Sequence, residues 1–495
     1  MTMPTDKRAL AAFPILVLCL AIAGCADTGG IAPQARLQPA NTLDVGNAIR
    51  QVGAEAGWPT RAWWEKYADP QLNRLIAAAI ADNPGMAVAA ARVRQAQSMA
   101  TATHAGEMPQ ASLEASMGRK NWSGNPYYGG GAYASTDTWN NTAQLNLSYD
   151  PDLWGQRRDA TARAEDELRA VAADGRSAQL DLEANVLRAY VTLSLEYGLL
   201  DSTSAMLEHE QQIVSLAQRR LQGGLGTQME ISQAQVPLPE TRRQMEALQE
   251  NIALARNQLA ALIGQGPGAG DSITRPTLQL DVAFGLPSVL PAELIGRRPD
   301  ISAARWRIEA ATQNIGIAKA AFYPNINLLA GIGPMAAGGG MLSFLTASNV
   351  STTFGPAISL PIFDGGRLRG QLGVAAAGYD IDVEHYKQLL TGALKSIADQ
   401  VVTLRSLQLQ KQDAELSVST ARSNLDNATH AYQRGLTGYL NVLTAQTQLL
   451  RQQQITQQLQ ARRFTAYATL ATALGGGFEL AQSEPIPPSA QGEVR

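Results

Sequence analysis

The stretch RLQGGLGTQMEISQAQ at residues 220–235 has a counterpart near the other end of the chain, YQRGLTGYLNVLTAQ at residues 432–446. The two stretches align at a constant spacing of 211 residues, which pairs Gly224 with Gly435. The same spacing continues downstream to residues 264 and 475. Such self-similarity indicates a duplicated supersecondary unit, present here in two copies.

The spacing of 211 also pairs Gly155 with Gly366, and further upstream the duplication continues at a spacing of 215 residues, which pairs Pro84 with Pro299. The change of four residues falls between Leu113 and Leu145. We therefore expect a loop in that interval whose length differs between the copies.

Two stretches of alternating apolar and polar residues in each copy predict β-strands. The apolar members are Ala111, Leu113, Ala115, Met117, Ala143, Leu145, Leu147 and Tyr149 in the first copy, and Ile326, Leu328, Ala330, Ile332, Phe354, Pro356, Ile358 and Leu360 in the second. A period of two places such side chains on one face of a sheet. The sequence thus predicts strand hairpins at about 110–150 and about 325–361.

The segments that follow the strands carry a helical pattern of unusual length. No proline occurs from Arg157 to about Gln222, and an apolar residue recurs at every seventh position from Val186 to Leu221. Five of the six equivalent positions in the second copy are also apolar. A sustained seven-residue repeat predicts a long helix that packs against its neighbours as in a coiled coil.

Glycines end both predicted long helices, because glycine readily adopts the left-handed conformation of a helix terminus. These glycines are Gly223, Gly224 and Gly226 in the first copy, and Gly435 and Gly438 in the second. A second helix then runs back from each turn. We expect tight helical hairpins with tips at about 223–227 and 435–438.

The first residues have the layout of a secretory signal, in which basic residues precede an apolar run, here Ala9 to Gly24, that is short for a membrane-spanning helix. The segment LAIAGC at residues 20–25 resembles a bacterial lipobox. This resemblance implies cleavage before Cys25 and attachment of lipid to that residue, and Ala26 after it favours the outer membrane. An ordinary signal that contains a cysteine is the alternative.

Composition argues against several classes of function. Apart from Cys25 the only cysteine is Cys19, within the predicted signal, so the mature chain has no pair for a disulfide. The formal net charge is -3, and the basic residues form no stripe suited to nucleic acid. The four histidines lack metal-ligand spacing, and no nucleophile or cofactor constellation occurs. We expect no enzyme activity, no metal and no cofactor other than the lipid on Cys25.

Strands with one apolar and one polar face suit a sheet that has lipid on one side and water on the other. Lipid tolerates no unpaired sheet edge, and the smallest usual closed barrel has about eight strands. Four strands in each chain therefore predict an oligomer whose identical copies share one barrel. A soluble sandwich with exposed polar faces is the alternative.

The chain resembles the TolC-like outer-membrane efflux proteins, specifically the NodT-type lipoprotein branch, over essentially its whole mature length. The matching stretches include WWEKYADPQLNRLIAAAIADNP from Trp63, YDPDLWGQRR from Tyr149, LIGRRPDISAARWRIEAATQNIGIAKAAFYPNINL from Leu294 and LPIFDGGRLRG from Leu360. The resemblance implies an internally duplicated α+β membrane protein. It would combine a long antiparallel α-helical barrel with a trimeric, twelve-stranded transmembrane β-barrel to which each chain gives four strands.

The same resemblance implies the outer-membrane channel of a tripartite efflux system, a passive exit duct for drugs or other small molecules. Its implied partners are two further copies of the chain, a periplasmic membrane-fusion adaptor, an inner-membrane pump of the RND type and outer-membrane lipid. The protein would be lipid-anchored in the outer membrane and extend into the periplasm. The alternative from another class is a non-conducting periplasmic structural or adaptor lipoprotein.

We accordingly divide the chain into five parts. They are a signal peptide at 1–24, a lipidated extended segment at 25–68, a first TolC-like repeat at 69–285, a second repeat at 286–478 and a disordered tail at 479–495. The tetrad RRPD at 297–300 is expected to fix the turn at which the second copy begins. The segments DLWG at 152–155 and FDGG at 363–366 are expected to join strand to helix, with glycine allowing the bend.

Two sets of residues are functional candidates. A duct needs a constriction at one end, and the helical hairpins form the end that is not embedded in lipid. The resemblance likewise assigns closure and adaptor contact to these tips. The expected adaptor contacts are Gly224, Leu225, Thr227, Gly435, Leu436 and Thr437, and the expected periplasmic gate comprises Leu425, Asp426, Asn427 and His430. Alternatively, the glycines only cap helices.

Overall fold

The structure is a computed structural model that describes residues 28–37, 43–44, 46–50, 57–124, 131–280 and 294–479. The expected signal peptide, Cys25 and the expected tail beyond Glu479 lie outside the described residues. The chain divides into two compact units. Unit 1 contains the described parts of residues 1–37, 93–171 and 304–385, and unit 2 those of 38–92, 172–303 and 386–495.

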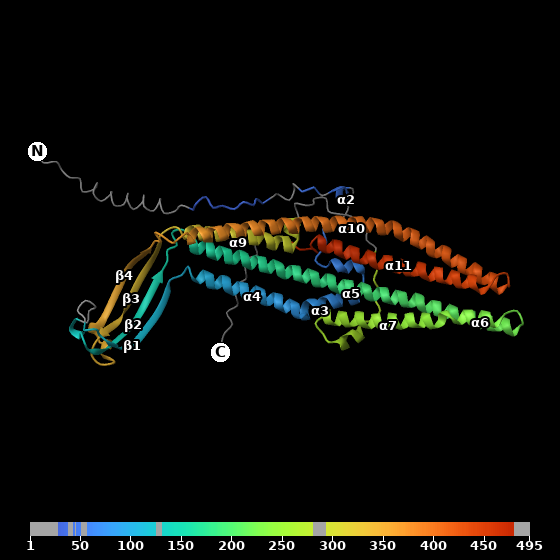
Figure 1. Cartoon of the computed structure of the whole chain (residues 1–495), viewed down its shortest axis with the longest axis horizontal. Helices are drawn as coiled ribbons and strands as arrows, with labels where there is room; N and C mark the ends of the chain where they lie inside the picture. Colours follow the sequence, from blue (N-terminus) through green and yellow to red (C-terminus); the bar gives the residue numbers. More distant parts are fainter. Residues whose placement is uncertain are drawn as a thin grey trace. The chain divides into compact units, whose positions relative to one another are not determined.

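Figure 1 labels the helices and strands along the chain. Their bounds are α2 Gly46–Arg50, α3 Pro70–Asp82, α4 Pro84–Ala105, β1 Gln110–Asn121, β2 Asp137–Tyr149, α5 Gln156–Gln222, α6 Gln228–Gln235, α7 Pro237–Leu262, α8 Leu294–Arg297, α9 Pro299–Ala320, β3 Asn325–Ala337, β4 Val350–Ser359, α10 Arg367–Gln433 and α11 Tyr439–Ala473. The two longest, α5 and α10, each have 67 residues, as the seven-residue repeats predict. None of the helices in the described part of the chain is both long and apolar enough to cross a membrane.

The four strands of unit 1 form one antiparallel sheet in the order β1-β2-β3-β4. The central pairing of β2 with β3 joins the two copies, with Leu145 opposite Ile332. The strands extend further toward their tips than the sequence pattern suggests, since β1 continues to Asn121 and β2 begins at Asp137. In the described chain β1 and β4 are the edges of this sheet.

The register of the strands brings the predicted apolar residues together on one face. Leu113 lies opposite Leu145, which lies opposite Ile332. Leu147 lies opposite Ala330, which lies opposite Phe354. The leucine, isoleucine and phenylalanine side chains among them remain exposed in the single chain, up to 86% for Phe354. The sheet therefore presents an uncovered apolar face.

Each long helix begins directly after a strand, at a joint that is built around an aspartate. Asp152 accepts hydrogen bonds from the backbone N–H groups of Arg157 and Arg158, both at 3.0 Å. In the second copy Asp364 accepts from the backbone N–H groups of Gly366 and Leu368, both at 2.9 Å. A carboxylate in this position satisfies free N–H groups of the first helical turn and favours its positive end.

In the core of unit 2, aromatic residues that precede α3 in the chain pack against α3 and α5. Trp63, Tyr67 and Tyr190 are fully or almost fully buried in it. Asp69 caps α3 and also accepts hydrogen bonds from the Tyr190 hydroxyl at 2.9 Å and the Thr277 N–H at 2.7 Å. Burial alone would raise the pKa of Asp69, but these hydrogen bonds outweigh burial and lower it.

The ends of the two repeats in unit 2 are held by equivalent glycine contacts. A Cβ at Gly264 would lie 2.3 Å from the carbonyl oxygen of Asp82, and a Cβ at Gly475 would lie 1.8 Å from that of Arg297. Both glycines have a positive φ, +75° and +93°. Arg298 completes the second contact, because it donates to the Ala473 carbonyl at 2.9 Å and pairs with Asp300. The tetrad at 297–300 therefore lies at the turn that opens the second copy.

The two return limbs differ. The sequence predicts one helix after each tip, and α11 is continuous, whereas the first limb is divided into α6 and α7 at Val236. Pro237 causes the interruption, since it has no N–H to donate to the preceding turn. Val236 keeps helical angles of -56° and -43°, so the chain continues in the same direction.

Candidate functional site

The first helical hairpin, at the end of α5, closes through glycine and a capping box. Gly224 has φ +69°, and the N–H of Leu225 donates to the Arg220 carbonyl at 2.8 Å. The Thr227 hydroxyl accepts from the N–H of Glu230 at 3.2 Å, while Glu230 accepts from the N–H of Thr227. Leu225 is left 73% exposed at the tip. The glycine and Thr227 shape the turn, and the leucine is available for contact.

The second hairpin, between α10 and α11, repeats this geometry. Gly435 has φ +75°, and the N–H of Leu436 donates to the Ala431 carbonyl at 2.9 Å. The Thr437 hydroxyl accepts a hydrogen bond from the Asn441 side chain. Leu436 is 77% exposed. Both tips therefore expose a leucine at equivalent positions of the repeat.

Arg220 connects the two tips and was not among the predicted site residues. Its guanidinium donates to the carbonyl of Tyr432 and to that of Leu225, both at 3.0 Å. It also lies over the Tyr432 ring, 4.8 Å from the ring centroid. The sequence holds one signal for this role, because the repeat pairs Arg220 with Ala431 and so supplies the cation only once.

Behind the tips lies a cluster of buried apolar residues from α5, α6, α10 and α11. Tyr432 and Tyr439 are at its centre, with ring centroids 5.9 Å apart. The other buried members are Ile213, Val214, Ala234, Leu425, Val442, Ala445 and Leu449. This cluster holds the second hairpin against the first.

A cavity of about 550 Å³ opens beside the cluster, between α5, α10 and α11. Asp426 and His430 line it from α10, with His209 from α5 and Gln446 from α11. Asp426 and His430 are one turn apart on the same face of α10 and are exposed. Within the described residues no group of three potential metal ligands occurs, here or elsewhere.

The four predicted gate residues have different surroundings in the structure. Leu425 is only 6% exposed and belongs to the buried cluster, although it also borders the cavity. Asp426 and His430 face the cavity, and Asn427 is exposed but is not part of its lining. Asp426 and His430 are thus the pair of predicted gate residues that share an open surface.

Glu210 is a buried acid that the sequence analysis did not single out. It is 1% exposed and its Oε1 accepts a hydrogen bond from the Thr241 hydroxyl at 3.0 Å, while Oε2 has no partner among the described residues. Burial raises the pKa of Glu210, an effect that the Thr241 hydrogen bond partly offsets. Burial, followed by the charge of Glu210, raises the pKa of Tyr439 to about 12. A signal was present in the sequence, because Glu210 lies between Leu207 and Val214 of the seven-residue repeat.

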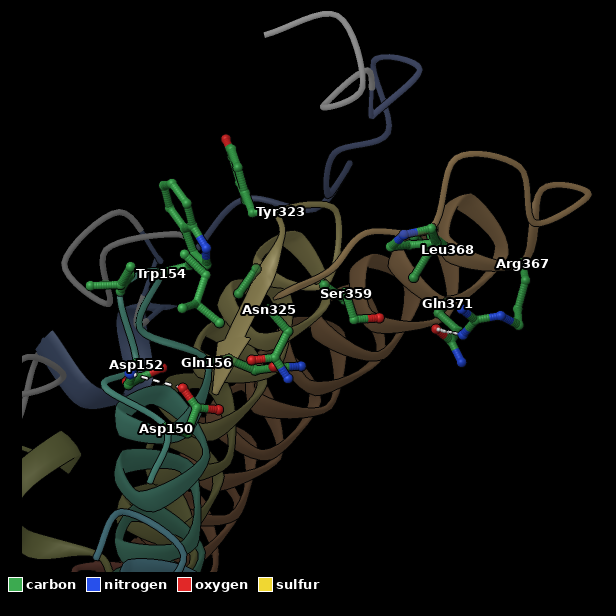
Figure 2. A pocket seen from close by; sticks show the side chains of 15 residues that line it. Asp150, Asp152, Trp154, Gln156, Tyr323, Asn325, Ser359, Arg367, Leu368 and Gln371 are labelled. Carbon is green, nitrogen blue, oxygen red and sulfur yellow. Dashed lines mark hydrogen bonds between the residues drawn. The ribbon is translucent and has the colours of Figure 1, made fainter. Parts of the chain in front are cut away.

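A second cavity, of about 290 Å³, lies in unit 1 at the strand-to-helix joint (Figure 2). Trp154 stacks on Tyr323 with ring centroids 4.8 Å apart, and its indole N–H donates to the Pro324 carbonyl at 2.7 Å. Asp150 and Asp152 are engaged by Arg157 and Arg158. Burial alone would raise the pKa of Asp152, but the backbone hydrogen bonds prevail and lower it. We assign this site a structural role in the joint.

An apolar-faced sheet, duplicated helices of 67 residues and two helical hairpins with exposed tips together define a channel protein of the bacterial outer membrane. A sequence profile of the outer membrane efflux protein family matches residues 75–265 and 290–476. The chain belongs to this family.

Individual relatives agree with this result. The fusaric acid resistance protein FusA of Burkholderia cepacia is 51% identical over 378 residues, which are 76% of this chain and 71% of FusA. The multidrug resistance outer membrane protein MdtP of Escherichia coli strain K12 is 30% identical over 92% of this chain and 94% of its own. The crystal structure of the outer membrane protein VceC of Vibrio cholerae matches with a TM-score of 0.79 at 38% identity, covering 85% of this chain and all of VceC.

The predicted family, fold class and outer-membrane location are therefore confirmed, and the lipid anchor on Cys25 stays a prediction. The protein is an outer-membrane efflux channel that extends into the periplasm, the channel component of a tripartite efflux system. Proteins of this family are channels rather than enzymes. The comparisons lend no support to the alternative of a non-conducting periplasmic lipoprotein.

Proposed function

We propose that three copies of the chain form a passive exit duct, which receives small molecules from an inner-membrane pump of the RND type through a periplasmic adaptor. The observation that carries this proposal is the sheet, whose apolar face is uncovered and whose edge strands β1 and β4 each pair on one side only within the described chain. A backbone N–H or C=O group that is exposed to lipid without a hydrogen-bond partner carries a large free-energy penalty. Three copies joined edge to edge would close the sheet into a cylinder of twelve strands.

The two faces of the sheet support the same arrangement. Opposite to the apolar face, Ser112 lies across from Asn146 and Glu114 across from Gln144. In a closed cylinder the apolar face would contact lipid and this polar face would line the water-filled interior.

We further propose that the adaptor contacts the hairpin tips and that lipid on Cys25 anchors the chain. Leu225 and Leu436 support the first point, because both are exposed apolar side chains at equivalent tips. Thr227 and Thr437 act within their own turns, and we assign them to shaping the contact. The lipobox-like sequence before Cys25 supports the second point.

The names of two relatives indicate the class of compound that the duct carries. FusA is named for fusaric acid resistance and MdtP for multidrug resistance. We propose small organic compounds, including weak aromatic acids, as cargo.

The experiment that tests this function combines a physical and a cellular measurement. The purified protein should migrate as a heat-resistant trimer from the outer-membrane fraction and form pores in planar bilayers. A deletion strain should become more susceptible to members of a panel of fusaric acid, dyes, detergents, antibiotics and metal salts. Trimers that never conduct, in a strain of unchanged susceptibility, would contradict the proposal.

A further inference from the structure

Residues 28–37 of unit 1 lie along the first part of α10 (Figure 1), beginning with a turn at Gly29 and Gly30 and continuing without helix or turn from Ile31. Alternate residues face the helix, since Ile31, Pro33 and Ala35 are partly buried while their neighbours are exposed. Ile31 packs against a cluster whose buried members are Ile315, Phe322, Leu368, Leu372 and Ala375. We call residues 28–37 the strap.

Asp380 holds the far end of the strap. Its carboxylate accepts hydrogen bonds from the backbone N–H of Gln34, at 2.9 and 3.2 Å, and from that of Ala35, at 2.8 Å. Two adjacent N–H groups on one carboxylate form a charge-assisted contact, which is stronger than neutral hydrogen bonds. The Asp380 carboxylate therefore holds the backbone of the strap at Gln34 and Ala35, beyond the apolar contact that Ile31 makes.

The strap has a defined direction. Its Gly29 lies against Arg369, and five residues later Gln34 reaches Asp380. Eleven residues of helix rise about 16 Å, a distance within the maximum reach of five residues of chain, about 18 Å. The strap therefore runs parallel to α10, and its earlier residues lie toward the beginning of that helix.

We propose that Asp380 and the strap set the position of the lipid anchor relative to the joint at which β4 passes into α10. This inference rests on the proposed lipidation of Cys25. Two residues lie between Cys25 and Thr28, and three Cα-to-Cα steps reach about 11 Å at most, so the lipidated residue is within that distance of Thr28. The anchor is thereby confined to the level of the first turns of α10.

Two exposed side chains at the joint fit a membrane boundary at this level. Ile362 and Phe363, directly before α10, are 87% and 91% exposed. Aromatic and apolar side chains of this kind are favoured where a membrane protein leaves the lipid. Docking the strap would place the acyl chains on Cys25 in the same layer as these residues.

Asp380 is a positioning residue in this proposal, and Arg36 provides a probe of its role. Trypsin cleavage after Arg36 requires the strap to leave the helix, since a protease binds several residues in extended form. In the full-length trimer we expect Asp380→Ala to accelerate this cleavage about tenfold or more, through loss of the charged contact. Asp380→Glu should restore much of the protection.

Asp399→Asn is the matched control. It removes a carboxylate from the same helix, but one that is exposed and paired only with Lys395 one turn away. We expect its cleavage rate to equal that of the wild type. Equal rates in the wild type and Asp380→Ala, with the trimer intact, would overturn the proposal.

A second measurement reports the position of the strap rather than its stability. Leu37→Cys places a reactive thiol at the end of the strap, and a nitroxide there can be relaxed by a lipid-soluble or a water-soluble agent in vesicles of outer-membrane phospholipid. We expect Asp380→Ala to change the ratio of the two relaxation rates, and Asp399→Asn to leave it unchanged. If the ratio of the two relaxation rates were the same in the wild type and in Asp380→Ala, the proposal would also be overturned.

The outcome can be separated from that of the proposed function. A mass spectrum without lipid on Cys25 would remove the anchor, and with it this inference, while pore formation and export would still test the duct. Conversely, a channel that fails to export would leave the cleavage and relaxation measurements unaffected.

Discussion

Gly264 and Gly475 have the same task in the two copies, since each allows a helix end to touch the backbone of another element. We predict that Gly475→Ala destabilises the folded chain by about 2–5 kcal/mol, because a Cβ would meet the Arg297 carbonyl oxygen at 1.8 Å and φ is +93°. The measurement is the yield and melting temperature of the heat-resistant trimer.

Gly224→Ala is the control for this prediction. It has a similar φ of +69°, but nothing lies within 4 Å of the added Cβ, so only backbone strain of about 1 kcal/mol is expected. Equal losses at the two sites would show that the close contact at Gly475 is unimportant.

Glu210 makes the packing behind the tips sensitive to pH. Its folded-state pKa is raised by burial, so the folded state binds more protons than the unfolded state. Its contribution to stability is complete below the ordinary pKa of about 4.3 and is lost as pH rises through the raised value. The groups that face it are the Thr241 hydroxyl on α7 and Tyr439 on α11.

We predict that Glu210→Gln removes this dependence and stabilises the protein at pH 8 by about 1–3 kcal/mol, because a buried charge with an unpaired oxygen is replaced by a neutral group. Melting temperatures of wild type and variant should converge near pH 4 and separate as pH rises. Glu208→Gln, on an exposed position of the same helix, should follow the wild type. Parallel curves for Glu210→Gln and the wild type would contradict the prediction.

Single residues also show where sequence reasoning stops. The left-handed glycines at both tips could be predicted, because helix termination is a local property. The contact of Gly475 with Arg297, the two carbonyls bound by Arg220 and the burial of Leu425 depend on residues far apart in the chain. No local pattern specifies which partner covers a given side chain.

At the scale of elements, the two hairpins form one assembly because Arg220 spans them. We predict that Arg220→Ala loosens the second hairpin and raises the open population. Loss of the hydrogen bond to the Tyr432 carbonyl and of the cation–π contact with its ring, about 1 kcal/mol each, would shift the equilibrium by about thirtyfold. Open probability in planar bilayers is the measurement. Arg220→Lys should be intermediate, because one ammonium does not reproduce the planar fork.

Arg434→Ala serves as the control, since Arg434 is an exposed arginine at the same tip. It should conduct like the wild type. Arg220→Ala with wild-type open probability would show that the link does not hold the hairpins together.

A separate prediction concerns Asp426, which faces the cavity between α5, α10 and α11 together with His430. If this acid belongs to the constriction, Asp426→Ala should increase ion conductance several-fold. Asn427→Ala, one residue away but outside the lining, should have little effect. Unchanged conductance in Asp426→Ala would remove this residue from the gate.

The elements themselves follow closely from periodicity. The seven-residue stripes predict α5 and α10, and the alternating residues predict the four strands with their common face, because amphipathic periods report which side of an element is covered. The division of the first return limb at Val236 is the exception. Pro237 and Pro239 lie within the stretch that the sequence predicts as one returning helix, and both lack the N–H that a continuous helix needs.

At the scale of the whole molecule, export requires the tips to meet another protein. We predict that Leu436→Asp abolishes export while trimers and pores persist, since a charge would be placed in an apolar contact and its desolvation would be unfavourable. Leu225→Asp should act in the same direction. Susceptibility of the complemented deletion strain, with trimer content measured in parallel, checks both.

Leu254→Asp provides the control. Leu254 is 57% exposed on α7, away from the tips in sequence, and its replacement should leave export intact. Full export by Leu436→Asp would show that the exposed leucine is not part of the adaptor contact.

The duplication explains why the channel class could be identified from sequence, since each motif occurs twice at fixed spacing. The residues that differ between the copies were harder to interpret. Arg220 and Glu210 have no equivalent in the second copy, where Ala431 and Ala421 stand. Such single-copy residues break the symmetry of the repeat, which marks their positions in the sequence but does not specify the residues that they contact.

The proline at 237 gives the two return limbs different mechanical properties. In α11 the backbone hydrogen bonds are continuous along the whole helix, so that limb resists bending. In the first limb Pro237 and Pro239 have no N–H to donate, so helical hydrogen bonds are missing just after Val236 and curvature can concentrate there at little energetic cost. A force applied at the tips would thus be absorbed as flexure by the first hairpin and passed along the chain by the second.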